Sequence, residues 1–154
     1  MSGGLPGPAG RPAEEVARAS AEHMWAGDRA SAALGMRLES VAPGCAALTM
    51  TVREDMVNGW DICHGGLIAT LADSAFAVAC NSRGTVTVAS GFDVSFLTSA
   101  RLGDELRAEA REVALGGRSG LYDVTVVRTA DGTVVAEFRG RSRSLTRPNP
   151  GLTA

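Results

Sequence analysis

The sequence predicts an α+β fold, in which an antiparallel sheet wraps around one long buried helix. Residues 66–80 are strong helix formers and are apolar almost all the way round, so this helix must be covered on every face. Segments with the alternating pattern of strands, punctuated by tight-turn signals, lie both before and after it. Only a sheet that curls around the helix covers all of its faces, so these two observations together favour a wrapped arrangement.

A helix and a hairpin are expected ahead of the buried helix. In residues 13–24 the apolar and small side chains recur at helical spacing, and Gly27 marks the expected end of that helix. Two strand-like stretches follow, residues 34–41 and 46–52, with a Pro-Gly pair between them that favours a turn. Residues 53–64 show no period and are expected to form a loop.

Four strands are expected after the buried helix. Residues 86–96 alternate in polarity, and Ser90 falls on the apolar face with the valines and phenylalanines. The later strands are separated by Gly-Gly and Asp-Gly pairs, which are typical of tight hairpins. They are expected near residues 105–115, 119–129 and 133–145. This half of the chain should form an antiparallel meander.

Length and composition fit one globular domain. The chain has 154 residues, of which 45% are hydrophobic and 21% charged, and the domain is expected to span residues 12–146. Residues 1–11 and 147–154 lack periodicity, so both are expected to be disordered tails. The formal net charge of -2 argues against a nucleic-acid partner, because such binders carry a basic excess.

The three cysteines indicate neither a disulfide framework nor a metal site. Their number is odd and no Cys-x-x-Cys spacing occurs, so we expect a cytoplasmic protein without bound metal or cofactor. The sequence has no uninterrupted apolar run of about 18 residues, and its first residues lack a basic region followed by an apolar one. The sequence therefore predicts neither a membrane-spanning nor a secreted protein.

Asp73 is the main anomaly of the buried helix. The polar residues Thr70, Asp73 and Ser74 are spaced i, i+3, i+4, so they share one narrow stripe of the helix. A carboxylate is almost never placed in an apolar helix without a partner, and burial should raise its pKa. Such a group suits a base or a nucleophile near neutral pH. The alternative is a structural aspartate that hydrogen-bonds the backbone or Ser90.

The triplet His64-Gly65-Gly66 marks the start of the same helix. The amide N–H groups of Gly65 and Gly66 have no acceptor within the helix, so they expose the positive end of the helix dipole. Such donors stabilise a carbonyl oxygen that gains negative charge during acyl transfer, and glycine allows a close approach. The alternative is a glycine-rich helix start that binds no ligand.

The spacing of these two features predicts a site shared between two chains. Gly65 and Asp73 are eight residues apart, which is about 12 Å along a helix, so they cannot both contact one thioester carbonyl. A twofold-symmetric dimer could place Gly65 of one subunit opposite Asp73 of the other. The sequence therefore predicts an oligomer, if the site exists.

Six other residues have two interpretations each. Cys63 is next to His64, but adjacent side chains generally point apart, so Cys63 is expected to be a packing residue. His64 could donate to a carbonyl or a leaving sulfur, or could only fix the loop. Arg118 could bind phosphate groups of a CoA tail. Arg139, Arg141 and Arg143 could do the same, but a solvated charged face is the favoured explanation for these three.

The motifs occur in an order that resembles one known family. They are Asn58-Gly59-x-x-x-Cys63-His64-Gly65-Gly66, Asp73, Ala79-Cys80-Asn81-Ser82 and Ser119-Gly120-x-Tyr122-Asp123-Val124. With them the chain closely resembles the PaaI group of hotdog thioesterases, over about residues 28–145. The resemblance implies a hotdog fold and hydrolysis of acyl-CoA thioesters, notably aromatic ones such as phenylacetyl-CoA and its ring-hydroxylated forms. It also implies a homotetramer of two hotdog dimers, and no cofactor, since coenzyme A is part of the substrate.

The resemblance also implies roles for individual residues. The Gly65 amide would bind the thioester carbonyl, and His64 would help to hold the carbonyl or the leaving sulfur. Asn58, together with Asp73 of the facing subunit, would place and activate water, with Asp73 as base or as nucleophile through a mixed anhydride. Ser90 would orient that water or Asp73, with a register that Gly91 leaves open by one residue. Gly66, Arg118 and Ser119 would bind the substrate.

Two other functions stay open at this point. A hotdog hydratase or dehydratase would need an Asp/His pair that acts on the β-carbon, and Asp61 and His64 are present but lie in the loop with a different spacing. A non-catalytic acyl-CoA binding protein would keep the fold without turnover.

Overall fold

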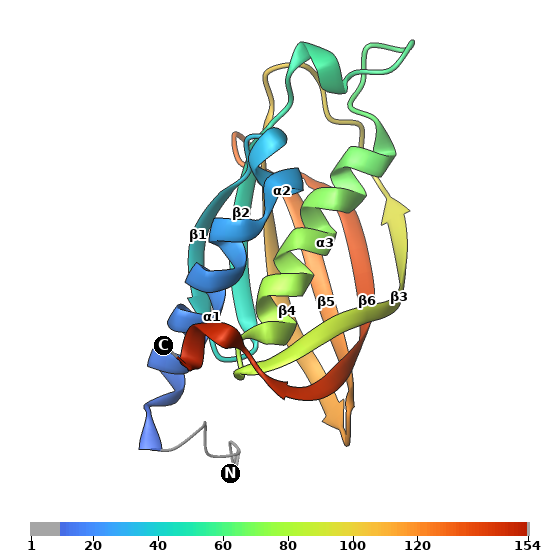
Figure 1. Cartoon of the computed structure of the whole chain (residues 1–154). Helices are drawn as coiled ribbons and strands as arrows, with labels where there is room; N and C mark the ends of the chain where they lie inside the picture. The colour runs from blue at the N-terminus through green and yellow to red at the C-terminus, as the bar shows by residue number, and fades with distance from the viewer. Residues whose placement is uncertain (1–9, 154) are drawn as a thin grey trace.

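A six-stranded antiparallel sheet curls around one long helix, α3 (Gly65–Asn81), in the computed structural model, which describes residues 10–153 (Figure 1). The strand order is β1-β2-β4-β5-β6-β3. The strands are β1 (Arg37–Ala42), β2 (Cys45–Thr51), β3 (Thr85–Phe96), β4 (Glu105–Gly116), β5 (Ser119–Arg128) and β6 (Val134–Pro148). This architecture confirms the expected hotdog fold.

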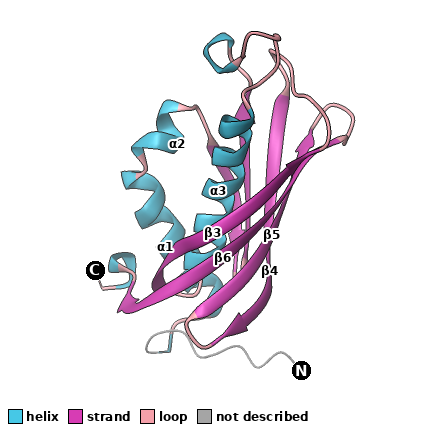
Figure 2. Cartoon of the chain, turned by 90° about the vertical axis from the view of Figure 1, so that its right-hand side faces the viewer, coloured by secondary structure: helices cyan, strands magenta, loops and turns pink. Residues whose placement is uncertain are grey.

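The core lies between α3 and the concave face of the sheet. The helix contacts all six strands, and α1 (Ala13–Gly27) with the short α2 (Arg29–Ala33) packs along its other side (Figure 2). Phe76 of α3 has its ring centroid 5.5 Å from that of Tyr122 and 5.8 Å from that of Phe138. Gly140 lies directly under the Phe76 ring, where an added Cβ would approach ring carbons to 2.9 Å. The helix therefore sits as close to β6 as the backbone allows.

The helix α2 is an element that the sequence pattern did not predict. It has five residues, too few to show a helical period. Its start is fixed by Asp28, whose side chain accepts a hydrogen bond from the backbone N–H of Ser31 at 2.9 Å. This is an N-cap, and it turns the chain between α1 and α2.

A β-bulge in β3 corrects the expected placement of Ser90. The pairing of β3 with β6 shifts between Ala89 and Gly91, so Ser90 is the extra residue. Beyond it, Phe92 pairs with Gly140 on the core side of the sheet. Before it, Val88 pairs with exposed Arg143. The alternation of residues 86–96 is thus reversed at Ser90, and the expectation of a single apolar face running through Ser90 was wrong.

The end of the chain also differs from the expected tail. Strand β6 runs to Pro148, and a 3-10 turn, η3 (Pro150–Leu152), packs against α1. Asn149 is 2% exposed: its N–H donates to the Gly84 carbonyl at 2.8 Å, and its Oδ1 accepts from the N–H of Gly151 at 2.9 Å. One buried asparagine thus fixes a segment that has no hydrophobic period. The expected tail at residues 1–11 falls almost wholly outside the described residues.

None of the helices in residues 10–153 is both long and apolar enough to span a membrane.

Candidate active site

A tight loop presents Asn58 just before the buried helix. Val57 and Cys63 form an isolated antiparallel bridge that closes the loop, and Asp61 at its tip has a φ of 58°. The backbone N–H groups of Trp60 and Ile62 both donate to Asn58 Oδ1, at 2.9 and 3.4 Å. Because backbone N–H groups need an acceptor, these bonds identify the oxygen side of the amide. The Nδ2 group has no hydrogen-bond partner among the described residues and is a free donor.

The N-terminus of α3 offers unpaired backbone donors. His64 is the N-cap residue and is exposed, and its own N–H is held by the Met56 carbonyl at 2.8 Å. The N–H groups of Gly65 and Gly66 donate to no residue within 10–153, as expected for the first turn of a helix. Pre-aimed donors of this kind stabilise an oxyanion.

A pocket of about 300 Å³ lies beside these donors. Asn58 and Gly65 both line it, so the structure brings these two predicted site residues together. The rest of its wall is mostly apolar: Ile62, Cys63, Ile68, Phe96, Leu97, Thr98 and Ser99. Phe96 was not among the predicted site residues, yet a Cβ on Gly65 would lie 3.0 Å from its ring. A side chain at position 65 would therefore press against the Phe96 ring.

Asp73 lies about two turns further along α3 and does not line this pocket. Its side chain is partly buried and makes no hydrogen bond to any described residue. Burial, and to a smaller extent the negative charge of Asp28, raises the pKa of Asp73 above its ordinary value. The alternative of a structural aspartate bonded to Ser90 is not what the structure has, because the Ser90 hydroxyl donates to the Arg141 carbonyl at 3.1 Å.

The cysteines near the site are neutral thiols. Burial raises the pKa of Cys63 to about 11, so its thiolate is scarce at neutral pH. Burial first, and then the charge of Asp73, raises the pKa of Cys80 to about 12. Cys63 is 4% exposed within the core cluster, in agreement with its expected packing role.

Arg118 and Ser119 lie at the opposite end of α3 from Gly65. Both line a smaller pocket of about 130 Å³, together with Cys80 and Tyr122. Arg118 forms no ion pair with a described residue, so its guanidinium is available to a ligand. Within one chain, this pocket and the Gly65 pocket share no lining residue, so Arg118 and Ser119 do not lie beside Gly65.

Of the three predicted arginines on β6, Arg139 and Arg141 are paired, whereas Arg143 is exposed and forms no ion pair with a described residue. Arg139 binds Asp123 through two hydrogen bonds of 2.7 and 2.8 Å, and Arg141 binds Asp93 at 2.7 Å. These pairs agree with a solvated charged face.

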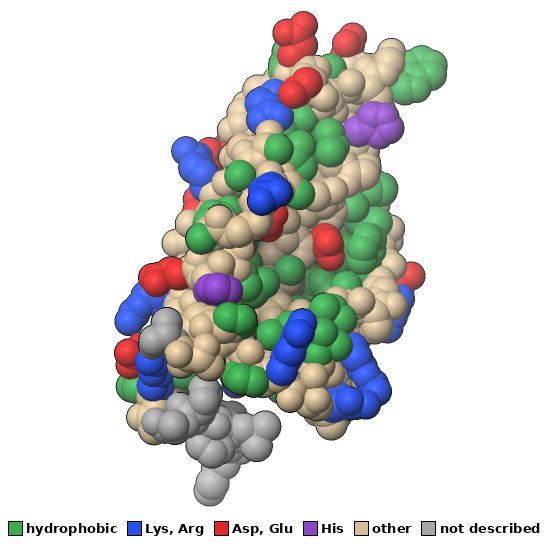
Figure 3. All heavy atoms as spheres, in the orientation of Figure 1, with side chains coloured by type: hydrophobic (Ala, Val, Ile, Leu, Met, Phe, Trp, Pro, Cys, Tyr) green, Lys and Arg blue, Asp and Glu red, His purple; other side chains and the backbone are tan. Residues whose placement is uncertain are grey.

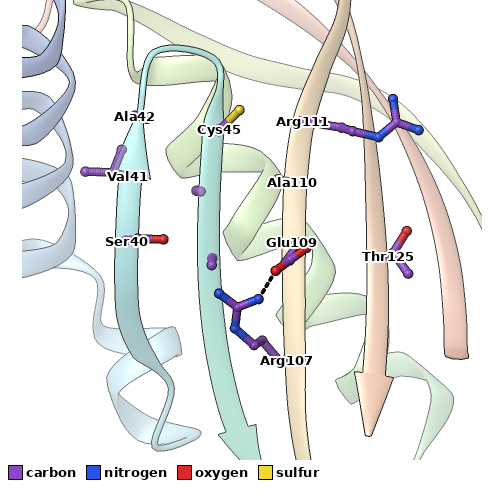
Figure 4. Close-up of a pocket in the computed structure, with 11 residues that line it drawn as sticks. Ser40, Val41, Ala42, Cys45, Arg107, Glu109, Ala110, Arg111 and Thr125 are labelled. Carbon is purple, nitrogen blue, oxygen red and sulfur yellow. Dashed lines mark hydrogen bonds and ion pairs between the residues drawn. The ribbon is translucent and has the colours of Figure 1, made fainter. Parts of the chain in front are cut away.

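A third hollow, of about 320 Å³, lies over β1, β2 and β4 on the face of the sheet away from α3 (Figure 4). Arg107 at its edge is bound to Glu109 and to Glu39. The sheet stands between this hollow and α3, the helix that carries Gly65 and Asp73.

Comparisons with known proteins agree with this fold. A family model described as the thioesterase superfamily matches residues 61–135. The acyl-coenzyme A thioesterase PaaI of Escherichia coli K12 is 42% identical over 126 residues, which cover 82% of this chain and 89% of that protein. The solved structure of E. coli PaaI, from the phenylacetic acid degradation operon, superposes with a TM-score of 0.86 at 39% identity, over 89% of this chain and 99% of that one.

A Streptococcus mutans protein solved with bound acetyl CoA is more distant, at 26% identity and a TM-score of 0.70, over 73% of this chain and 90% of that one. Similarity of the fold thus accompanies the sequence identity. The chain belongs to the thioesterase superfamily, within its PaaI group of hotdog-fold thioester hydrolases.

Proposed function

We propose that this enzyme, an acyl-CoA thioesterase, hydrolyses aromatic acyl-CoA thioesters to free acid and CoA at a site shared by two subunits. One observation carries the proposal. Unpaired Gly65 and Gly66 amides lie beside an apolar pocket, and an unpartnered carboxylate with a raised pKa, Asp73, lies about 12 Å along the same helix. Each is half of a hydrolytic site.

The chemistry needs the two halves on one thioester. The carbonyl oxygen of the substrate accepts a hydrogen bond from the Gly65 amide, with Gly66 beside it. Asp73 of the facing subunit takes a proton from water as the water oxygen bonds to the carbonyl carbon. The tetrahedral intermediate then expels the CoA sulfur, which takes up a proton, and the acid leaves. The alternative is direct attack by Asp73, with water then cleaving the mixed anhydride.

Three further residues have supporting roles in this proposal. Asn58 offers its free Nδ2 donor to the attacking water or the carbonyl. His64 precedes Gly65 and would help to hold the carbonyl or the leaving sulfur. Ser90, in the bulge of β3, would orient water or Asp73, although its hydroxyl is bound to the Arg141 carbonyl in the single chain. No metal or cofactor takes part.

The free edge of β3 favours a homodimer. Strand β3 pairs only with β6, so its other edge is open within the described sheet, and Phe92 and Phe96 on it are 42% and 50% exposed. Figure 3 shows hydrophobic side chains gathered over α3 and β3 on one side of the molecule. Open edges with exposed aromatic rings are suited to pairing with another strand. A second copy related by a twofold axis would cover this surface, and two such dimers would form the homotetramer that the resemblance implies.

The substrate class rests on two supports. The E. coli relative belongs to a phenylacetic acid degradation operon, and the Phe96 ring beside Gly65 offers an aromatic wall to an aromatic acyl group. The unpaired Arg118, with Ser119, is the proposed partner of the CoA phosphates. The S. mutans structure with acetyl CoA supports the use of this fold for CoA binding.

The deciding experiment is thiol release from a panel of aromatic and aliphatic acyl-CoAs. We expect the highest kcat/KM with phenylacetyl-CoA or its hydroxylated forms. Asp73→Asn should lower kcat by about two to four powers of ten while substrate binding persists. Asp61→Asn is the matched control. Asparagine tolerates the positive φ of Asp61, so the loop can keep its shape. If the enzyme were instead a hydratase that used Asp61, this variant would lose the hydratase activity. No thiol release from any acyl-CoA would contradict the proposal.

A further inference from the structure

A line of hydrogen bonds joins the α1–α2 junction to the turn of α3 that carries Asp73. The Ser31 hydroxyl donates to Asp28 Oδ2 at 2.6 Å, and the Ser31 and Ser74 hydroxyl oxygens are 2.8 Å apart. Ser31 is 1% exposed. A serine hydroxyl has one proton, and that of Ser31 is given to Asp28, so Ser74 must be the donor to Ser31. The order of donation is Ser74 to Ser31 to Asp28.

Asp28 is held rigidly at the end of this line. Its Oδ1 accepts the N–H of Ser31 at 2.9 Å as the N-cap of α2, while its Oδ2 accepts the Ser31 hydroxyl. Both carboxylate oxygens are therefore in use, which fixes the position of the negative charge. That charge acts on Asp73, the residue directly before Ser74.

Side chains fix α3 at several points along its length. Phe76 packs against the rings of Tyr122 and Phe138, and Asn81 donates to the Thr87 carbonyl at 2.8 Å and accepts the Thr87 N–H at 2.9 Å. Ser74 is the described helix residue whose side chain bonds α2. This contact fixes the turn of α3 that carries Asp73.

We propose that Asp28 and Ser31 are positioning residues for Asp73, holding its helix turn through Ser74 and placing a fixed negative charge near its carboxylate. The inference rests on the proposed function of Asp73. Cys80 is the other titratable group that interacts with Asp73 in the described chain, and it stays neutral at working pH because its pKa is about 12. In the two-chain site, His64 of the facing subunit would also lie near Asp73. It is unchanged in every variant compared below, so it does not account for differences between their pH profiles.

Two kinds of variant separate position from charge. Ser31→Ala and Ser74→Ala break the line of hydroxyls, and each should lower kcat about three- to tenfold with KM changed less than twofold. Ser74→Thr keeps a hydroxyl and should recover most of the lost kcat. Asp28→Asn keeps the N-cap acceptor and removes the charge, and its Nδ2 group can donate to the Ser31 hydroxyl, which then donates to Ser74. Its kcat/KM profile should have an acidic limb shifted to lower pH by about 0.3–0.5 units, because a carboxylate with one less negative neighbour ionises more easily.

Glu22→Gln is the matched control, since Glu22 is an exposed acid on α1 with no described hydrogen bond, and its removal should leave the acidic limb in place. The inference would be overturned if the acidic limb of the kcat/KM profile lay at the same pH in Asp28→Asn and in Glu22→Gln. It would also be overturned if kcat were unchanged in Ser31→Ala. A carbon-13 titration of the Asp73 carboxyl gives a readout independent of turnover. If its pKa falls in Asp28→Asn but the wild type releases no thiol, the link to Asp28 stands and the hydrolase proposal fails instead.

Discussion

At the scale of one residue, the burial of Asp73, the proposed catalytic carboxylate, works against stability. Its pKa is raised mainly by burial, so the folded chain holds the carboxyl proton more tightly than the unfolded chain does. The stability that this group contributes is fully present below the ordinary pKa of 3.8 and is lost as the pH rises through the raised value. At neutral pH the fold therefore carries an ionised, unpartnered side chain.

Asp73→Asn should consequently be more stable than the wild type at neutral pH, even though it is far less active. Asparagine has a similar shape and no charge to desolvate, so we expect Tm to rise by about 1–3 °C at pH 7. The gain should shrink as the pH is lowered through the raised pKa of Asp73, where the wild-type carboxyl becomes protonated. Differential scanning calorimetry at several pH values measures both effects. A lower Tm for Asp73→Asn at pH 7 would show that the carboxylate has a stabilising partner.

The sequence singled out the site residues whose chemistry is anomalous where they stand. Asp73 stands out in an apolar helix, and Gly65 stands out at a helix start. The orientation of the Asn58 amide and the position of Phe96 beside Gly65 depend on contacts that no local sequence pattern encodes. The Asn58 oxygen is taken by the backbone of its own loop, and Phe96 reaches Gly65 from a strand that starts after the helix ends.

At the scale of elements, the close approach of α3 to β6 is the most specific feature of the packing. Gly140 lies under the Phe76 ring, which in turn packs against Tyr122 and Phe138. A side chain at position 140 would have to push the helix and its aromatic cluster away from the sheet. Well-packed cores respond to such added volume as strain.

Gly140→Ala should therefore destabilise the protein by about 1–3 kcal/mol. The new Cβ would lie 2.9 Å from ring carbons, so Phe76 must leave its rotamer or the helix must shift. Gly116→Ala is the matched control, because a Cβ there meets nothing within 4 Å and the residue also lies in a strand. Urea unfolding of both variants at one protein concentration measures the difference. Equal free energies of unfolding would refute the packing argument.

The elements that were predicted are those with enough residues to show a period. The helices α1 and α3 and the six strands each have one, and all eight are found. The bulge at Ser90 was not predicted, because the chain leaves the register of β6 for a single residue. The ordered end of the chain was not predicted either, since one buried side chain, Asn149, fixes it rather than a repeated pattern.

At the scale of the whole molecule, the proposed site has two halves that one chain cannot bring together. Gly65 lies beside one pocket, and Asp73 lies about 12 Å away along a rigid helix. No bending of α3 closes that distance, because the helix is packed against all six strands. The open edge of β3 provides the surface on which a second copy would complete both halves at once.

Mixing two inactive variants tests this shared site. Asp73→Ala removes the carboxylate half and His64→Ala alters the loop half, so each homodimer should be strongly impaired. In a mixed dimer, one site carries both changes and the other carries neither. After complete exchange of equal amounts, half of the dimers are mixed, so about a quarter of all sites should be intact and thiol release should recover to about that fraction.

The control is Asp73→Ala mixed with a differently tagged Asp73→Ala, which should stay inactive after the same exchange. Native mass spectrometry of the tagged species establishes that mixed dimers have formed. If they form and no activity returns, both groups belong to a site within one chain, and α3 would have to be interrupted in the active enzyme. Because the packed helix allows no such break, we expect recovery, and its size should follow the fraction of mixed dimers as the mixing ratio is varied.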